Sequence, residues 1–183
     1  MFAFSENVCY NTTMSAKKTA ALGLLLCVAL ILSYLESILL PPIPVPGIKI
    51  GLGNLAVVAV LYFYGWREAG IINLLRILIL ALLFGNAMGL LFSLTGAFGS
   101  FLVMCLIKRS KRASVMLVSM VGGVVHNMGQ LLAAMLFFSV NLFWYYLPVM
   151  LVAGLLTGTL IGLAAGILIR RCGPLFTETE AKI

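Results

Sequence analysis

The sequence predicts an all-α integral membrane protein with about six transmembrane helices. Hydrophobic residues make up 63% of the 183 residues and charged residues only 9%, whereas a soluble domain typically carries about 25% charged residues. A chain with this few charged residues cannot cover its core with a hydrated surface. The lipid bilayer must therefore act as its solvent. Apolar runs recur along the chain, and each span needs roughly 20 residues. We expect one membrane domain over 18–170, between cytoplasmic tails at 1–17 and 171–183.

The first three expected helices each end at residues that disfavour a helix. The first, over 18–40, ends at a pair of prolines, and two more prolines keep the following segment extended. The second, over 50–65, is short and ends at a glycine. The third, over 68–85, ends at a glycine followed by an asparagine. These breaks define the first half of the bundle.

The last three expected helices are separated by a basic cluster and an aromatic segment. The fourth, over 88–107, stops at the basic cluster, and the fifth, over 113–139, begins after it. The sixth, over 146–169, follows an aromatic loop at 143–146. Aromatic rings are favoured at the membrane–water interface, so this loop should lie there.

The distribution of basic residues predicts the orientation. With the N-terminus inside, one basic residue, Lys49, falls in an outer loop, and Arg76 lies within a span. The basic residues of the inner segments are Lys17, Lys18, Arg67, Lys108, Arg109, Lys111, Arg112, Arg170, Arg171 and Lys182. This excess predicts that both termini are cytoplasmic. Short basic clusters between apolar runs also argue against binding to nucleic acid.

The fifth expected span carries polar side chains on one face. His126, Asn127 and Gln130 share this face with Gly122 and Gly123. Polar groups in the hydrocarbon region are costly and usually have a partner or a task. The functional interpretation is a face that lines a substrate cavity. The alternative is that small and amide residues hold helices together by close packing and hydrogen bonds.

Four further residues are candidates for the same cavity. Arg76 lies within the third expected span and Glu36 near the outer end of the first, so they either form an ion pair or leave Arg76 facing an anionic substrate group. Lys49 and Asn54 flank a glycine-rich turn. They either anchor a loop or form part of a lid, with Lys49 as a counter-charge.

A four-residue repeat of glycines runs along the sixth expected span. Its members are Gly154, Gly158, Gly162 and Gly166. Such a stripe allows another helix to approach closely, so we interpret it as a packing surface. The neighbour is either another helix of this chain or a second chain.

Several chemistries lack the residues that they require. The chain contains no aspartate, which excludes aspartate-rich motifs that bind magnesium diphosphate and triads with aspartate. It has no phosphate-binding loop of the G-x-x-x-x-G-K-[ST] type. One histidine and four scattered cysteines do not build an ordinary zinc site. We therefore expect neither an enzyme nor a bound metal or cofactor.

Three stretches together resemble a known family. They are Glu36-Ser37 followed by prolines at 42, 44 and 46, then Lys49-x-Gly51-Leu52-Gly53-Asn54, then His126-Asn127-x-x-Gln130. Over about residues 17–169 the chain resembles the bacterial Gx transporter family, often labelled heptaprenyl diphosphate synthase component I. That family is similar in turn to the substrate-binding S components of energy-coupling factor (ECF) transporters.

The resemblance implies an S-component-like bundle in the bacterial plasma membrane that binds a small molecule. It implies a lid at Pro41–Asn54 and a pocket that includes His126, Asn127 and Gln130. It also implies that small residues on the first helix dock a membrane coupling subunit driven by two ABC ATPases. The matching residues here are Ala16, Ala20 and Gly23, with two lysines between the alanines.

The expected function is therefore substrate binding for an ECF-type importer of a small vitamin-like or isoprenoid/quinone-precursor molecule. Lys49, Arg76 and His126 near the cavity would suit a ligand with an anionic end. One alternative is a membrane accessory subunit for polyprenyl diphosphate or quinone biosynthesis. Another is a stand-alone secondary transporter or flippase, with Glu36 or His126 as the proton-coupled group.

Overall fold

The computed structural model describes residues 3–39, 51–84, 87–110, 113–137 and 140–177. Across these ranges it is helical, with no strand. The helices are α1 (Ala3–Leu39), α2 (Leu52–Phe63), α3 (Trp66–Phe84), α4 (Ala87–Arg109), α5 (Val115–Ala134) and α6 (Val140–Thr177). The all-α membrane bundle predicted from the sequence is confirmed.

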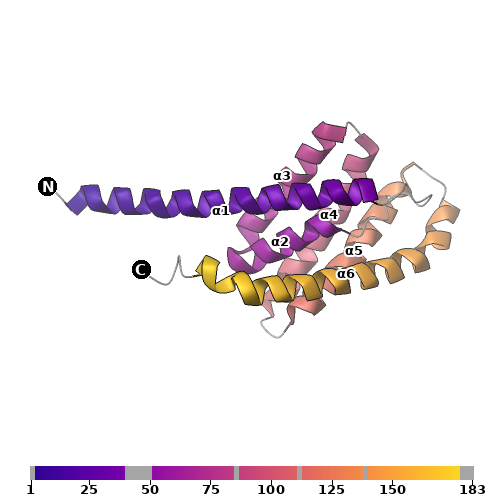
Figure 1. Cartoon of the computed structure of the whole chain (residues 1–183). Helices are drawn as coiled ribbons and strands as arrows, with labels where there is room; N and C mark the ends of the chain where they lie inside the picture. The colour runs from indigo at the N-terminus through magenta and orange to yellow at the C-terminus, as the bar shows by residue number, and fades with distance from the viewer. Residues whose placement is uncertain (1–2, 40–50, 85–86, 111–112, 138–139, 178–183) are drawn as a thin grey trace.

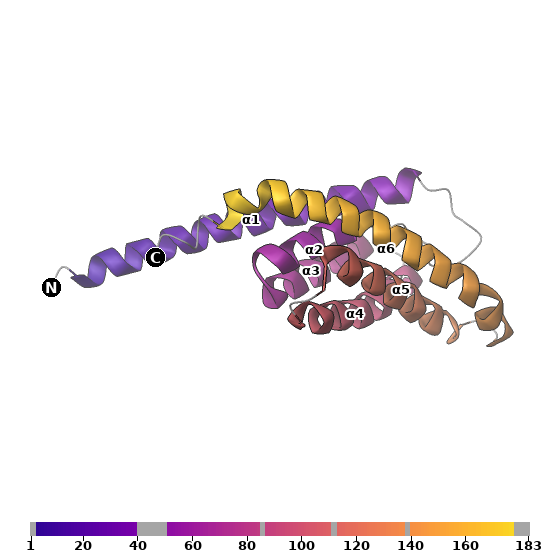
Figure 2. The ribbon, with the colours of Figure 1, turned by 90° about the horizontal axis from the view of Figure 1, so that it is seen from below.

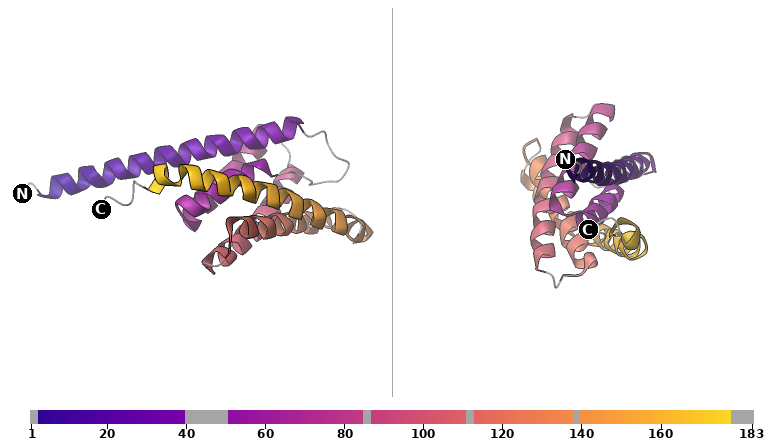
Figure 3. Two further views of the ribbon diagram at one scale, coloured as in Figure 1. Left: turned by 60° about the horizontal axis from the view of Figure 1, so that its bottom comes forward. Right: turned by 90° about the vertical axis from the view of Figure 1, so that its left-hand side faces the viewer.

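The helices form two layers of three. In one layer α4 packs between α3 and α5, and in the other α2 packs between α1 and α6 (Figure 3, right). The start of α1 and the end of α6 lie toward the same end of the bundle (Figure 1). The ion pair between Lys18 Nζ and Glu68 Oε1, 2.6 Å apart, joins α1 to α3.

Four helices contain segments that are long and apolar enough to cross a membrane. The segments are Ala16–Ile38, Ala87–Arg109, Val115–Ala134 and Phe143–Gly173. Large apolar side chains such as Leu82, Phe98 and Leu160 are exposed on the outer faces. In a bilayer these faces meet lipid rather than water. The two remaining helices are α3, which carries three charged residues, and the short α2.

Helix α2 is enclosed by the rest of the bundle. None of its residues is exposed, and Ala56–Leu61 are buried, as is typical of a helix that is apolar on every side. Its 12 residues extend about 18 Å, against a hydrocarbon core of about 30 Å. The C-terminal end lies beside Lys108, at the basic end of the bundle. The N-terminal end lies beside Glu36, near the other end of the apolar segment Ala16–Ile38 of α1.

The glycine stripe of α6 packs against α5. A Cβ atom at Gly154 would lie 2.8 Å from the Val124 Cα, and one at Gly158 would lie 2.8 Å from the Met120 Cα. Only glycine permits backbones to approach this closely. The packing interpretation is confirmed for Gly154, Gly158 and Gly162, and their neighbour is a helix of the same chain, whereas nothing lies within 4 Å of a Cβ at Gly166. Figure 2 shows α5 between α4 and α6.

Four helix boundaries differ clearly from the predicted ones, and two of them belong to α6, which extends over Val140–Thr177 rather than 146–169. Helix α1 begins at Ala3 rather than at residue 18, because no proline or glycine interrupts the chain before Gly23. Helix α5 ends at Ala134, five residues before the predicted end at 139, in a turn where Phe137 N donates to Ala134 O. The apolar run there has no feature that marks this turn.

The predicted aromatic loop at 143–146 is wrong, since α6 begins at Val140 and includes these residues. Phe143 stacks edge-to-face on Trp144, and Tyr145 does so on Tyr146. Pro148 also lies within the helix. Proline is tolerated inside membrane helices because neighbouring groups can satisfy the freed carbonyl.

Candidate functional site

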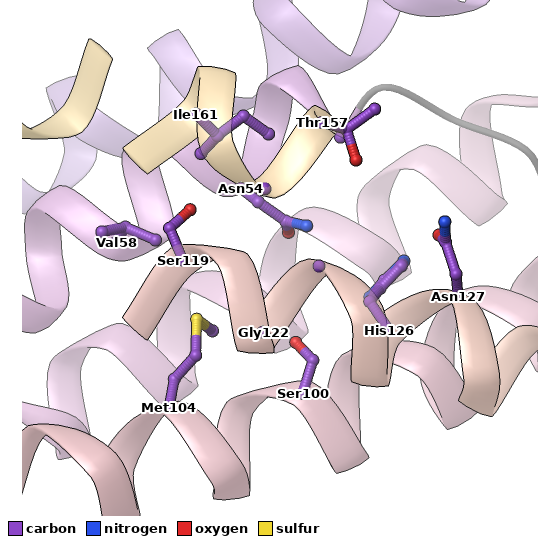
Figure 4. A pocket seen from close by; sticks show the side chains of 13 residues that line it. Asn54, Val58, Ser100, Met104, Ser119, Gly122, His126, Asn127, Thr157 and Ile161 are labelled. Atoms are coloured by element: carbon purple, nitrogen blue, oxygen red, sulfur yellow. The ribbon is translucent and has the colours of Figure 1, made fainter. Parts of the chain in front are cut away.

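A small cavity lies between α2, α4, α5 and α6. Its polar lining residues are Asn54, Ser100, Ser119, His126, Asn127 and Thr157 (Figure 4). Its volume is about 20 Å³, which is enough for one or two water molecules. No lysine, arginine or acidic side chain is among the described residues that line it. The cavity therefore combines apolar walls with several polar side chains and carries no formal charge on its walls.

Arg76 lies behind this cavity and binds one of its walls. The side chain is only 7% exposed, and its Nη2 donates to Asn54 Oδ1 and to Asn73 Oδ1, both at 3.0 Å. Glycine at position 53 makes room for the guanidinium, because a Cβ there would lie 2.3 Å from Arg76 Nη1. Arg76 thus joins α3 to the first turn of α2 without lining the cavity.

Glu36 holds the N-terminal end of α2. Its carboxylate accepts hydrogen bonds from Gly51 N at 2.6 Å and from Leu52 N at 2.9 Å. The first amides of a helix lack partners within the helix and carry partial positive charge, so a carboxylate satisfies and stabilises them. Gly51 has a φ of 78°, in the left-handed region that favours glycine.

The direct Glu36–Arg76 ion pair considered for the sequence is not formed, because each side chain has other partners. Glu36 binds backbone amides and Arg76 binds two asparagine oxygens. Neither side chain lines the cavity. Both act instead on the segment from Gly51 to Asn54, which does line it.

Lys108 holds the opposite end of α2. Its Nζ donates to Leu61 O and lies 4.9 Å from the centre of the Tyr62 ring. A cation near the last carbonyls of a helix complements the helix dipole. Sequence reasoning assigned Lys108 only to the basic cytoplasmic cluster and missed this contact.

The polar face of α5 both lines the cavity and contacts the neighbouring helices. His126 and Asn127 line the cavity, and Asn127 Nδ2 also donates to Met150 O in α6 at 3.1 Å. Gln130 is only 2% exposed and does not line the cavity. Its Nε2 lies 3.1 Å from His126 Nε2, and its Cγ packs on Gly96 of α4.

Three hydroxyl groups of the cavity were missed in the sequence. Ser100 comes from α4, Ser119 from α5 and Thr157 from α6. Ser119 lies seven residues before His126, which places it on the same face of the helix. That spacing was a usable signal. No equivalent pattern marks Ser100 or Thr157, whose place depends on how the helices pack.

The remaining predicted site residues lie either on the surface or in the segment of the chain outside the described residues. Lys49 and the loop at 41–49 lie outside the described residues, whereas Gly51–Asn54 at the end of the predicted lid lie within them. On α1, Ala16, Ala20 and Gly23 are exposed, and nothing lies within 4 Å of a Cβ placed at Gly23. Within the described ranges, no three histidine, cysteine or acidic side chains gather to hold a metal ion.

These features define a polytopic helical membrane protein with a small cavity between its helices, lined in part by polar side chains. The family model for heptaprenyl diphosphate synthase component I matches residues 25–168, and the chain belongs to that family. No curated protein and no solved structure matches the chain.

Proposed function

We propose that the chain is the substrate-binding membrane subunit of an ECF-type importer and that the cavity is its binding site. The observation that carries the proposal is a cavity between apolar helices, beside the N-terminal end of α2, with six polar side chains in its lining. Transporters place substrate sites near the membrane midplane, where helices end or are interrupted.

The cavity must widen to bind a small molecule. Binding sites for such ligands usually measure about 300–1,000 Å³, and the volume here is about 20 Å³. Helices α5 and α6 meet backbone to backbone at Gly123, Gly154 and Gly158, so that contact has little freedom. Helix α2 meets α6 through a side chain, with Ile161 Cδ1 against Gly51. We therefore propose that ligand entry separates α2 from α6.

The proposed importer needs partners in the bacterial plasma membrane. The chain has no ATP-binding loop, so a separate coupling subunit with two ABC ATPases would supply the energy. The exposed small residues Ala16, Ala20 and Gly23 on α1 offer that subunit a surface for close approach. In this proposal the chain binds its substrate and catalyses no reaction.

The family description favours a second candidate, a membrane accessory subunit for prenyl diphosphate synthesis. Prenyl condensation relies on carboxylates that hold magnesium on the diphosphate, and this chain has no aspartate. In that role it would have to associate with a separate synthase that carries the catalytic residues.

Affinity purification of the tagged chain from its native membrane, followed by mass spectrometry of the associated proteins, separates the two candidates. Recovery of a membrane coupling subunit with paired ABC ATPases supports the importer. Recovery of a soluble aspartate-rich synthase supports the accessory subunit. The triple substitution of Ala16, Ala20 and Gly23 by leucine should abolish recovery of the coupling subunit while leaving the bundle folded.

A further inference from the structure

The partners of Asn54 determine which of its amide atoms faces the cavity. Arg76 has only hydrogen-bond donors, so it must bind the oxygen of the amide. The structure shows this contact between Arg76 Nη2 and Asn54 Oδ1 at 3.0 Å. The amide nitrogen is left for the cavity side. It lies next to Gly51, which also lines the cavity, 3.1 Å from where a Cβ of residue 51 would be.

The walls formed by α5 and α6 have the opposite character. Asn127 Nδ2 donates to Met150 O, so Asn127 Oδ1 remains as an acceptor. Thr157 Oγ1 donates to Ala153 O at 2.9 Å, so that its hydroxyl oxygen remains as an acceptor too. The cavity therefore has an amide donor on α2 facing acceptors on α5 and α6, as Figure 4 shows for these side chains. The hydroxyls of Ser100 and Ser119 and the imidazole of His126 also line it and can donate or accept.

The charges behind the cavity already balance. Glu36 and Arg76 carry opposite charges, are 6% and 7% exposed, and are both used in hydrogen bonds to protein groups. A charged ligand group in the cavity would add a buried charge without a counter-ion, which is strongly unfavourable. An uncharged group adds none.

We propose that Arg76 is a positioning residue that makes Asn54 a fixed hydrogen-bond donor of the cavity, and that the cavity takes an uncharged ligand group with an acceptor oxygen. The same group would offer a donor to Asn127 Oδ1 or Thr157 Oγ1. A carboxamide, a lactam or a cyclic urea has this chemistry. The ligand class rests on the proposed function, and it replaces the anionic ligand expected from the sequence.

The orientation of Asn54 can be measured without a ligand. The chain has seven asparagines, so asparagine-specific ¹⁵N labelling in lipid nanodiscs gives an NMR spectrum with few side-chain amide signals. Each asparagine side chain contributes one pair of NH₂ proton signals, and the pair that disappears in Asn54→Asp belongs to Asn54. We expect these protons to exchange with water in the wild type. Arg76→Met should shift the Asn54 and Asn73 pairs and leave Asn127, the internal control, unchanged.

Two results would overturn the role of Arg76. One is an Asn54 pair that keeps its shift and its water exchange in Arg76→Met. The other is measured on the wild type and does not depend on whether the variant folds. It is the finding that the NH₂ protons of Asn54 contact the Arg76 guanidinium protons and show no contact with water.

The ligand class is tested with acetamide, acetate and acetamidinium, which have the same shape and differ in charge. We expect acetamide to shift the Asn54 and Asn127 pairs saturably, and each ion to bind at least about tenfold more weakly. Equal or tighter binding of acetate or acetamidinium overturns the uncharged class. No shift with any of the three counts against the cavity as a ligand site, and so against the proposed function, while the orientation of Asn54 is decided separately.

Discussion

Helix α6 meets its two neighbours in different ways. Against α5 it packs backbone to backbone, with Gly154 and Gly158 on the atoms of the facing helix. Against α2 it contributes Ile161 and Thr157 to the wall of the cavity. At these glycines the first contact has no side chain between the two backbones that could rearrange, whereas the second leaves space. The comparison indicates that α5 and α6 move as a unit and that binding changes their distance from α2.

The largest expected loss of stability comes from Arg76→Met, on the α2 side. This change leaves the oxygens of Asn54 and Asn73 without their donor and removes the charge that balances Glu36. Removing one member of a set of buried charges typically costs about 3–5 kcal/mol. Thermal unfolding in detergent measures it. If the charges balance as described, adding Glu36→Gln to Arg76→Met recovers part of the lost stability. A double variant whose loss equals the sum of the two single losses would contradict that balance.

The packing of α6 on α5 gives the next largest effect. Gly158→Val places methyl groups against Met120 and Ser119 backbone atoms that cannot move aside, and overpacking of this kind costs about 1–3 kcal/mol. Gly166→Val is the matched control, because nothing lies within 4 Å of a Cβ there. The two variants should differ clearly in unfolding temperature. Equal losses would show that the stripe does not hold α6 on α5.

Glu36→Gln alone should have a smaller effect. A glutamine oxygen can still accept from one of the two amides, while the charge that complements the start of α2 is lost. Hydrogen bonds to charged groups contribute about 1.5–3 kcal/mol. Hydrogen exchange of the Gly51 and Leu52 amides should accelerate more than exchange in the middle of α2. Uniform acceleration along α2 would argue against a local role.

Lys108→Met should have the smallest effect of the four. It removes the hydrogen bond to Leu61 O and the contact with Tyr62, which together contribute about 1 kcal/mol at a partly exposed site. Lys108→Arg should retain most of this, since it keeps the charge and the donors. Arg109→Met, at an exposed position one residue on, is the control. A larger loss for Arg109→Met would contradict the assignment.

The sequence predicts the bundle and the glycine contact well because both depend on short-range patterns. Apolar runs of span length identify the helices, and a four-residue repeat places Gly154, Gly158 and Gly162 on one face whatever the tertiary fold. Helix ends, such as the start of α1, are predicted less well from the sequence. A helix that leaves the membrane continues until something breaks it, and nothing in the first residues does so.

The α2 side could be predicted only in part. Glu36 and Arg76 stand out as ionisable residues in apolar surroundings, but their partners come from other helices, and one of those partners is the backbone. A sequence pattern marks charged side chains and does not mark the amides at the start of a helix. Ser100 and Thr157 have the same difficulty, because a lone hydroxyl on a helix has no preferred partner until the helices pack.

The most direct test of the central claim, that the cavity binds a ligand, is to identify small molecules retained by the purified protein. The wild type and a Ser100→Val variant, which fills the cavity from α4, would be isolated from the native membrane and analysed by mass spectrometry, with Ser110→Val at an exposed turn as the control. We predict a molecule with an uncharged acceptor group that the wild type and Ser110→Val retain and Ser100→Val loses. Equal retention by all three would contradict the assignment of the cavity.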